Sequence, residues 1–98
     1  MSNLLFMATG DISFGWAVNT VIKKHGYDYL FELVTPILSQ AGLVLANLEG
    51  PVSTRGTAIK KSTRFRYHPD CLTALKRAGI DAVTVANNHT LDYGRTAL

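Results

Sequence analysis

Three short apolar segments recur along the chain, separated by stretches with the periodicity of helices. They lie at residues 4–8, 43–46 and 82–85 and consist mostly of Leu, Val, Ala, Phe and Met. Runs of this length, bounded by polar residues, are typical of strands that are buried on both faces of a parallel sheet. We therefore predict three buried strands at these positions.

Two helices are predicted between the first two strands. Residues 16–24 end in basic side chains, and Gly26 follows where a helix cap is expected. Residues 29–41 carry apolar side chains at helical spacing. Because Pro36 lies inside this second segment, either the helix kinks or a new helix begins near the proline.

A third helix is predicted at residues 69–78, directly before the last strand. Its apolar face carries Leu72 and Leu75, which we expect to be buried. Lys76 and Arg77 lie in its last turn, where positive charge is favourable, and we expect both to be exposed.

The alternation of strands and helices predicts the α/β fold class, with three parallel strands and crossover helices against them. Residues 52–66 lack periodicity and are predicted to form a long surface loop, with a short strand near residues 65–67. A chain of 98 residues is short for covering a sheet on both sides. We therefore expect an apolar face or edge of the sheet to stay uncovered and the chain to self-associate or to be marginally stable.

The composition argues against a nucleic-acid partner, an internal disulfide and a membrane-spanning segment. Ten Lys and Arg stand against seven Asp and Glu, and a net charge of +3 is too small to indicate nucleic-acid binding. The single cysteine, Cys71, cannot form an internal disulfide and is expected to be a buried helix residue. No signal peptide and no apolar run of about 20 residues is visible, so the chain as it stands is expected to be cytoplasmic without a transmembrane segment.

Each predicted strand ends in a polar cluster. Asp11 follows the first strand, Glu49 the second, and Asn88 and His89 the third. The carboxyl ends of parallel strands share one edge of a sheet, so these side chains should converge. Their oxygen and nitrogen donors suit Mn, Zn, Fe or Mg, bound as one or two ions. Each cluster alone is a weak signal, and the Gly10-Asp11 pair alone is more typical of a turn, but the three together favour a metal site.

These clusters resemble the motifs of the bacterial capsule synthesis protein family, often called CapA, which includes poly-γ-glutamate synthesis proteins. The matching segments are residues 10–12, 46–51, 86–89 and 92–94, in that order. The family is similar to the calcineurin-like metallophosphoesterases, whose fold packs two sheets between helices. The resemblance implies that residues 1–98 are the N-terminal portion of such a domain, the first half of an α/β/β/α sandwich.

The resemblance also implies roles for the clustered residues. Asp11 corresponds to the first metal-binding aspartate and Glu49 to the carboxylate that bridges two metals. Asn88 corresponds to the carboxamide ligand, and His89 to the histidine that acts on the leaving group.

Asn47 and Asn87 would contact these ligands without binding the metal themselves. The chain departs from the phosphoesterase pattern at Ser13, where a metal-binding histidine is expected. His25 and His68 match none of the family's motifs, and the further histidines of the C-terminal half are not in this chain. We therefore expect any divalent metal to bind weakly and this portion alone to turn over little substrate.

Three functions stay open at this point. The first is a metal-dependent, phosphoesterase-like hydrolase module of capsule or poly-γ-glutamate biosynthesis, present as an incomplete domain, with a phosphoester as substrate. Relatives of such a module can be membrane-anchored or lie at the cell surface. The others are an inactive truncated fragment and a non-catalytic module that binds an anionic polymer. The polymer would be attracted by the basic residues of the loop, namely Arg55, Lys60, Lys61, Arg64 and Arg66.

Overall fold

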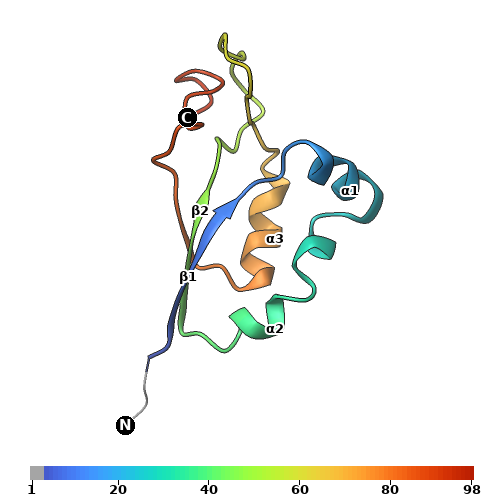
Figure 1. Ribbon diagram of the computed structural model, residues 1–98, viewed down its shortest axis with the longest axis vertical. Coiled ribbons are helices and arrows are strands. Elements are labelled where there is room, and N and C mark those ends of the chain that lie inside the picture. The colour runs from blue at the N-terminus through green and yellow to red at the C-terminus, as the bar shows by residue number, and fades with distance from the viewer. Residues whose placement is uncertain (1–3) are drawn as a thin grey trace.

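The computed structural model describes residues 4–98 and shows an α/β fold with three parallel strands. The strand order is β1-β2-β3, so β2 lies in the middle and pairs in parallel with both neighbours (Figure 1). The elements in chain order are β1 (Phe6–Ile12), α1 (Ala17–His25), the 3-10 helix η1 (Asp28–Phe31), α2 (Thr35–Leu38), β2 (Leu43–Leu48), α3 (Asp70–Ala78) and β3 (Ala82–Thr84). The predicted fold class and the parallel pairing are confirmed.

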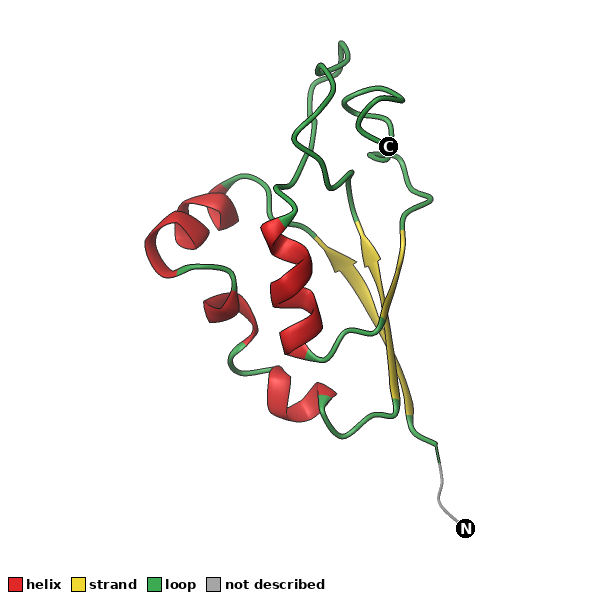
Figure 2. Ribbon diagram, turned by 180° about the vertical axis from the view of Figure 1, so that it is seen from behind, coloured by secondary structure: helices red, strands yellow, loops and turns green. Residues whose placement is uncertain are grey.

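The sheet is covered on one face only. The helices lie together on one side of the strands in both views (Figures 1 and 2). On that side the alternate residues Val44, Ala46 and Leu48 of β2 are 0%, 2% and 1% exposed. On the other side Phe6 and Leu43 keep 51% and 40% of their surface exposed. The prediction of strands buried on both faces is therefore wrong for this chain, whereas the expected open apolar face is present.

Strand β1 is longer than its apolar run, because it continues beyond Ala8 to Ile12. Ala8 pairs with Leu45, but Asp11 pairs with Asn47, so β1 carries one extra residue between these two pairs. An extra residue of this kind is a β-bulge, and it reverses which face the following side chains occupy. As a result Asp11 lies on the open face beside Asn47 instead of under the helices.

The first predicted helix is confirmed as α1, and Gly26 caps it with a positive φ of 83°. Residues 29–41 do not form one helix; η1 and the short α2 replace it. Pro36 lies in the first turn of α2. A backbone N–H at this position has no acceptor within the helix, so proline, which lacks this N–H, is tolerated there. The proline thus starts a new helix, which was one of the two predicted outcomes.

Helix α3 agrees with its prediction except at one position. Its buried residues are Cys71, Ala74, Leu75 and Ala78, which recur at helical spacing. Leu72 is 49% exposed, so its predicted burial is wrong. Leu72 directly follows Cys71 and therefore lies about 100° around the helix from it. Because Cys71 and Leu75 face the core, Leu72 points toward solvent.

Two irregular segments extend beyond the carboxyl ends of the strands, at the top of Figure 1. The first joins β2 to α3 and contains a single parallel bridge between Val52 and Tyr67. Its Phe65 and Tyr67 are buried, which anchors the loop to the core. The second follows β3 and consists of turns up to the C-terminal end of the chain. Between residues 4 and 98 no helix is long and apolar enough to cross a membrane.

Candidate functional site

A row of hydrogen-bonded polar side chains crosses the open face of the sheet at the carboxyl ends of the strands. Asp11, Asn47 and Thr84 occupy neighbouring positions on the three strands. Asn47 Nδ2 donates to Asp11 Oδ1 at 2.8 Å, and Thr84 Oγ1 donates to Asn47 Oδ1 at 2.8 Å. The bulge in β1 is what brings Asp11 into this row, so the predicted convergence depends on it.

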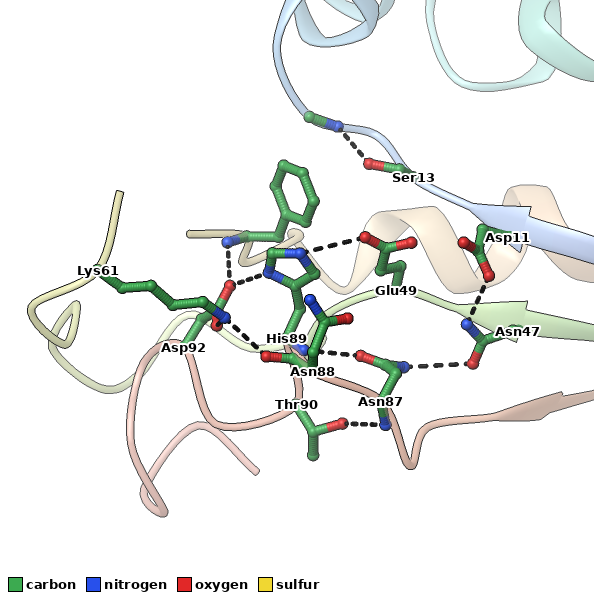
Figure 3. A network of polar contacts seen from close by, with 12 residues as sticks. Asp11, Ser13, Asn47, Glu49, Lys61, Asn87, Asn88, His89, Thr90 and Asp92 are labelled. Atoms are coloured by element: carbon green, nitrogen blue, oxygen red, sulfur yellow. Dashed lines mark hydrogen bonds and ion pairs between the residues drawn. The ribbon is translucent and has the colours of Figure 1, made fainter. Parts of the chain in front are cut away.

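The carboxyl groups of Asp11 and Glu49 face one another (Figure 3). The backbone N–H of Glu49 donates to Ile12 O at 3.0 Å, which holds Glu49 beside the end of β1. Hydrogen bonds with Asn47 and with Glu49 lower the pKa of Asp11. The pKa of Glu49 is raised, first by its hydrogen bond with Asp11, then by burial and by the Asp11 charge. Two neighbouring carboxylates resist joint ionisation, and a bound cation would relieve their repulsion.

Asn87 ties the turn after β3 to the middle strand. Its Nδ2 donates to Asn47 Oδ1 at 3.2 Å and to Leu48 O at 2.9 Å. Its Oδ1 accepts the backbone N–H of His89 at 3.0 Å. Asn47 therefore holds Asp11, and Asn87 holds the turn after β3, by hydrogen bonds.

His89 is buried, with 6% of its surface exposed, and both ring nitrogens meet carboxyl groups. Nε2 lies 3.2 Å from Glu49 Oε1, and Nδ1 lies 2.5 Å from Asp92 Oδ2. The Phe65 ring packs against the imidazole at 4.4 Å between centroids. With Glu49 and Asn88, His89 lines a hollow of about 580 Å³, here called the His89 hollow. Asp11 lies outside this lining and joins the cluster through Glu49.

Asp92 and Lys61 complete the cluster. From the sequence, Lys61 was expected only as part of the basic loop and Asp92 only as part of the motif at residues 92–94. Asp92 is 1% exposed and accepts three hydrogen bonds: from Lys61 Nζ at 2.7 Å, from the Phe65 amide at 2.8 Å, and from His89 (Figure 3). Burial alone raises the pKa of Asp92, but the hydrogen bonds from Lys61, His89 and Phe65 together outweigh it, so the pKa is lowered. The ionised Asp92 can only accept, so His89 Nδ1 carries the proton.

His89 and Asp92 are three residues apart, and this spacing was the sequence signal that could have revealed Asp92 as the partner of His89. Lys61 had no such signal, because a basic residue in an aperiodic loop is typical of solvated charge. Its Nζ also donates to Asn88 O at 2.7 Å, which joins the loop before α3 to the turn after β3.

The donor set fits an oxygen-preferring cation only in part. Asp11 and Glu49 offer facing carboxylates, and the exposed Asn88 offers a carboxamide. However, no three His, Cys, Asp or Glu side chains within residues 4–98 are arranged to hold a metal ion. Ser13 turns toward the core and shares a hydrogen bond of 3.0 Å with the Tyr67 hydroxyl.

The two unassigned histidines make other contacts. His25 stacks on Tyr29 at 4.2 Å, and His68 contacts Asp70 at 3.3 Å. Both are exposed, in agreement with the absence of any motif around them.

The family model described as "Bacterial capsule synthesis protein PGA_cap" matches residues 5–98. The chain belongs to this family. It is 32% identical over 95 residues to the "Capsule biosynthesis protein CapA" of Bacillus anthracis, which covers 93% of this chain. It is 31% identical over 87 residues to the "PGA biosynthesis protein CapA" of Bacillus subtilis (strain 168), covering 87% of this chain. The matched region spans 23% of the length of each relative.

Proposed function

We propose that this family member forms part of a metal-dependent, phosphoesterase-like hydrolase module that acts in capsule or poly-γ-glutamate biosynthesis. The names of the two Bacillus relatives support the biosynthetic context. The hydrolase half rests on one observation, the Asp11 and Glu49 carboxyl groups facing one another beside a buried histidine. Paired carboxylates with a shifted pKa next to a hollow are a common feature of catalytic sites.

The ligands of a divalent ion would be Asp11, Glu49 and Asn88. Such an ion, whether Mn, Zn, Fe or Mg, supplies Lewis-acid polarisation of a phosphoester. The residues themselves contribute preorganisation, because the hydrogen bond from Asn47 fixes the Asp11 carboxylate and Asn87 holds the turn that carries Asn88. A ligand set held in place in this way loses less entropy when it binds.

In its doubly protonated form, His89 would donate the Nε2 proton to the leaving oxygen while its Nδ1–H stays on Asp92. Its Nε2 points toward Glu49, and its Nδ1 is held by Asp92, so the ring cannot rotate without breaking a buried hydrogen bond. The Phe65 ring shields one side of the imidazole from water. This arrangement presents Nε2, and only Nε2, to a substrate in the His89 hollow.

The alternative is a non-catalytic module that binds an anionic polymer. The observation in its favour is that Arg64 and Arg66 in the loop before α3 are exposed. The two functions make different demands, since polymer binding needs neither Asp11 nor Glu49.

The proposal is tested by thermal unfolding with and without Mn²⁺ or Zn²⁺. Metal at ten times its dissociation constant stabilises by about 1.4 kcal/mol, equivalent to a rise in Tm of about 5–10 °C for a chain of this size. Asp11→Ala and Glu49→Ala should abolish most of this rise. Asp28→Ala, which removes an exposed carboxylate paired with Arg77, should leave it intact. An equal rise in all four proteins would show that the metal binds elsewhere, and no rise in the unchanged chain would refute the metal site.

A further inference from the structure

A second hollow lies between the start of α1 and the loop that precedes α3. We call it the Arg66 hollow and define it by Trp16, Arg64, Phe65, Arg66, His68 and Tyr93. Its volume of about 420 Å³ is within the range of about 300–1,000 Å³ common for ligand pockets. None of the residues that line it is an Asp or a Glu. The hollow is therefore aromatic and positively charged.

Its two arginines carry positive charge without an acidic partner. The ion pairs formed within residues 4–98 include neither Arg64 nor Arg66. Arg66 is nevertheless held in place: it donates to Arg55 O and Gly56 O, each at 3.1 Å, and lies 4.3 Å from the centre of the Tyr93 ring. A guanidinium that is already ordered loses less entropy on binding and matches the two oxygens of a carboxylate.

Trp16 forms the outer wall of the Arg66 hollow in an unusual conformation. Its side chain is 76% exposed, although it is the largest apolar side chain of the sequence. Its backbone has φ 54° and ψ −130°, and it is the one non-glycine residue with positive φ among those the structure describes. Strain of this type concentrates at binding and catalytic sites. An indole held in water by a strained backbone is suited to cover the aliphatic part of a ligand.

The Arg66 hollow adjoins the His89 hollow. Gly15, Trp16 and Phe65 line both. The Phe65 ring contacts Trp16 at 6.0 Å and His89 at 4.4 Å between centroids. A long ligand could therefore occupy both hollows at once.

We infer that the Arg66 hollow is a binding subsite for a segment of a carboxylate-bearing polymer, with poly-γ-glutamate as the representative. Arg64 and Arg66 bind its carboxylates, and Trp16 covers the methylene groups between them. The polymer identity rests on the proposed function, whereas the binding itself requires neither a metal ion nor His89.

Trp16 makes the inference directly measurable, because it is the only tryptophan in the sequence. Titration with short poly-γ-glutamate should give a saturable change in its fluorescence. Arg64→Gln and Arg66→Gln should each weaken binding several-fold, and the double variant at least about tenfold, because each change removes charge-assisted hydrogen bonds to a carboxylate. The matched control is Arg77→Gln, an exposed arginine on α3 that pairs with Asp28 and should bind as before.

Two further measurements distinguish specific binding in the Arg66 hollow from charge attraction alone. Arg66→Lys keeps the charge but loses the paired donors, so it should weaken binding. A polyphosphate of equal charge also suits arginine but offers Trp16 no methylene groups, so it should compete less well than poly-γ-glutamate. Circular dichroism checks that each variant is folded. Equal weakening by Arg77→Gln, equal competition by polyphosphate, or no saturable signal would overturn the subsite.

Failure here and failure of the proposed function give different results. The double variant Arg64→Gln, Arg66→Gln should lose polymer binding while keeping the metal-dependent rise in Tm, because neither arginine lies among the proposed metal ligands. Polymer binding without a metal effect would leave the subsite standing and reject the hydrolase site, and a metal effect without polymer binding would do the reverse.

Discussion

Replacing Asp92 by alanine should remove one of the strongest local contributions to the stability of this chain. The carboxylate accepts hydrogen bonds from Lys61, from the Phe65 amide and from His89. Phe65 and His89 are only 8% and 6% exposed, so both donors would lose their acceptor without gaining water. Each buried donor left unpaired costs about 1–3 kcal/mol. Lys61 has 30% of its side chain exposed and can return to solvent, so the expected loss is about 2–5 kcal/mol.

The measurement is urea unfolding at pH 7, followed by far-ultraviolet circular dichroism. The control is Asp28→Ala, because Asp28 makes a single exposed ion pair with Arg77 and should contribute at most about 1 kcal/mol. A domain of this size has a total stability of about 5–15 kcal/mol, so the difference is easily resolved. If Asp92→Ala loses no more stability than Asp28→Ala, the reasoning from burial and hydrogen bonding is refuted.

The pH dependence of unfolding provides a second test of Asp92. Folding lowers the pKa of this carboxyl, so its contribution is fully present above the unfolded pKa of about 4 and is lost as pH falls through the lower folded value. Asp92→Asn should therefore be less stable at pH 7, and its stability should fall less steeply between about pH 5 and pH 2. Parallel curves for the two proteins would contradict the lowered pKa.

Three further predictions concern the core, the open face and the thiol. Leu75→Ala should cost about 2–5 kcal/mol in urea unfolding and Leu72→Ala less than about 1 kcal/mol, because Leu75 is 4% exposed and Leu72 49%. Phe6→Lys on the open sheet face should weaken self-association in sedimentation equilibrium, and a chain that is monomeric at every concentration would argue against an association surface there. Burial raises the pKa of Cys71 to about 11, so a disulfide reagent at pH 8 should react far more slowly with the folded chain than with the chain in urea.

The sequence by itself determined the order of the elements and the positions of most of the site. Helix α3 was predictable because proline before it, basic residues in its last turn and Gly79 after it are local signals. Asp11, Glu49, Asn88 and His89 were predictable as a cluster because each ends an apolar run, and parallel strands share one carboxyl edge. The single helix expected at residues 29–41 was wrong, since the proline and tertiary packing overrode its apolar periodicity.

Only the tertiary structure decided which faces were buried and which side chains became partners. The bulge between Ala8 and Asp11 leaves no clear mark in the sequence, yet it determines the face on which Asp11 lies. Lys61 and Asp92 are 31 positions apart, and neither carries a local signal of the other. A periodic pattern records how one element alternates between polar and apolar residues, but it carries no information about the element packed against it. The buried Asp92 cluster and the Arg66 hollow arise from such long-range contacts, so they appear only when the loops are folded over the sheet.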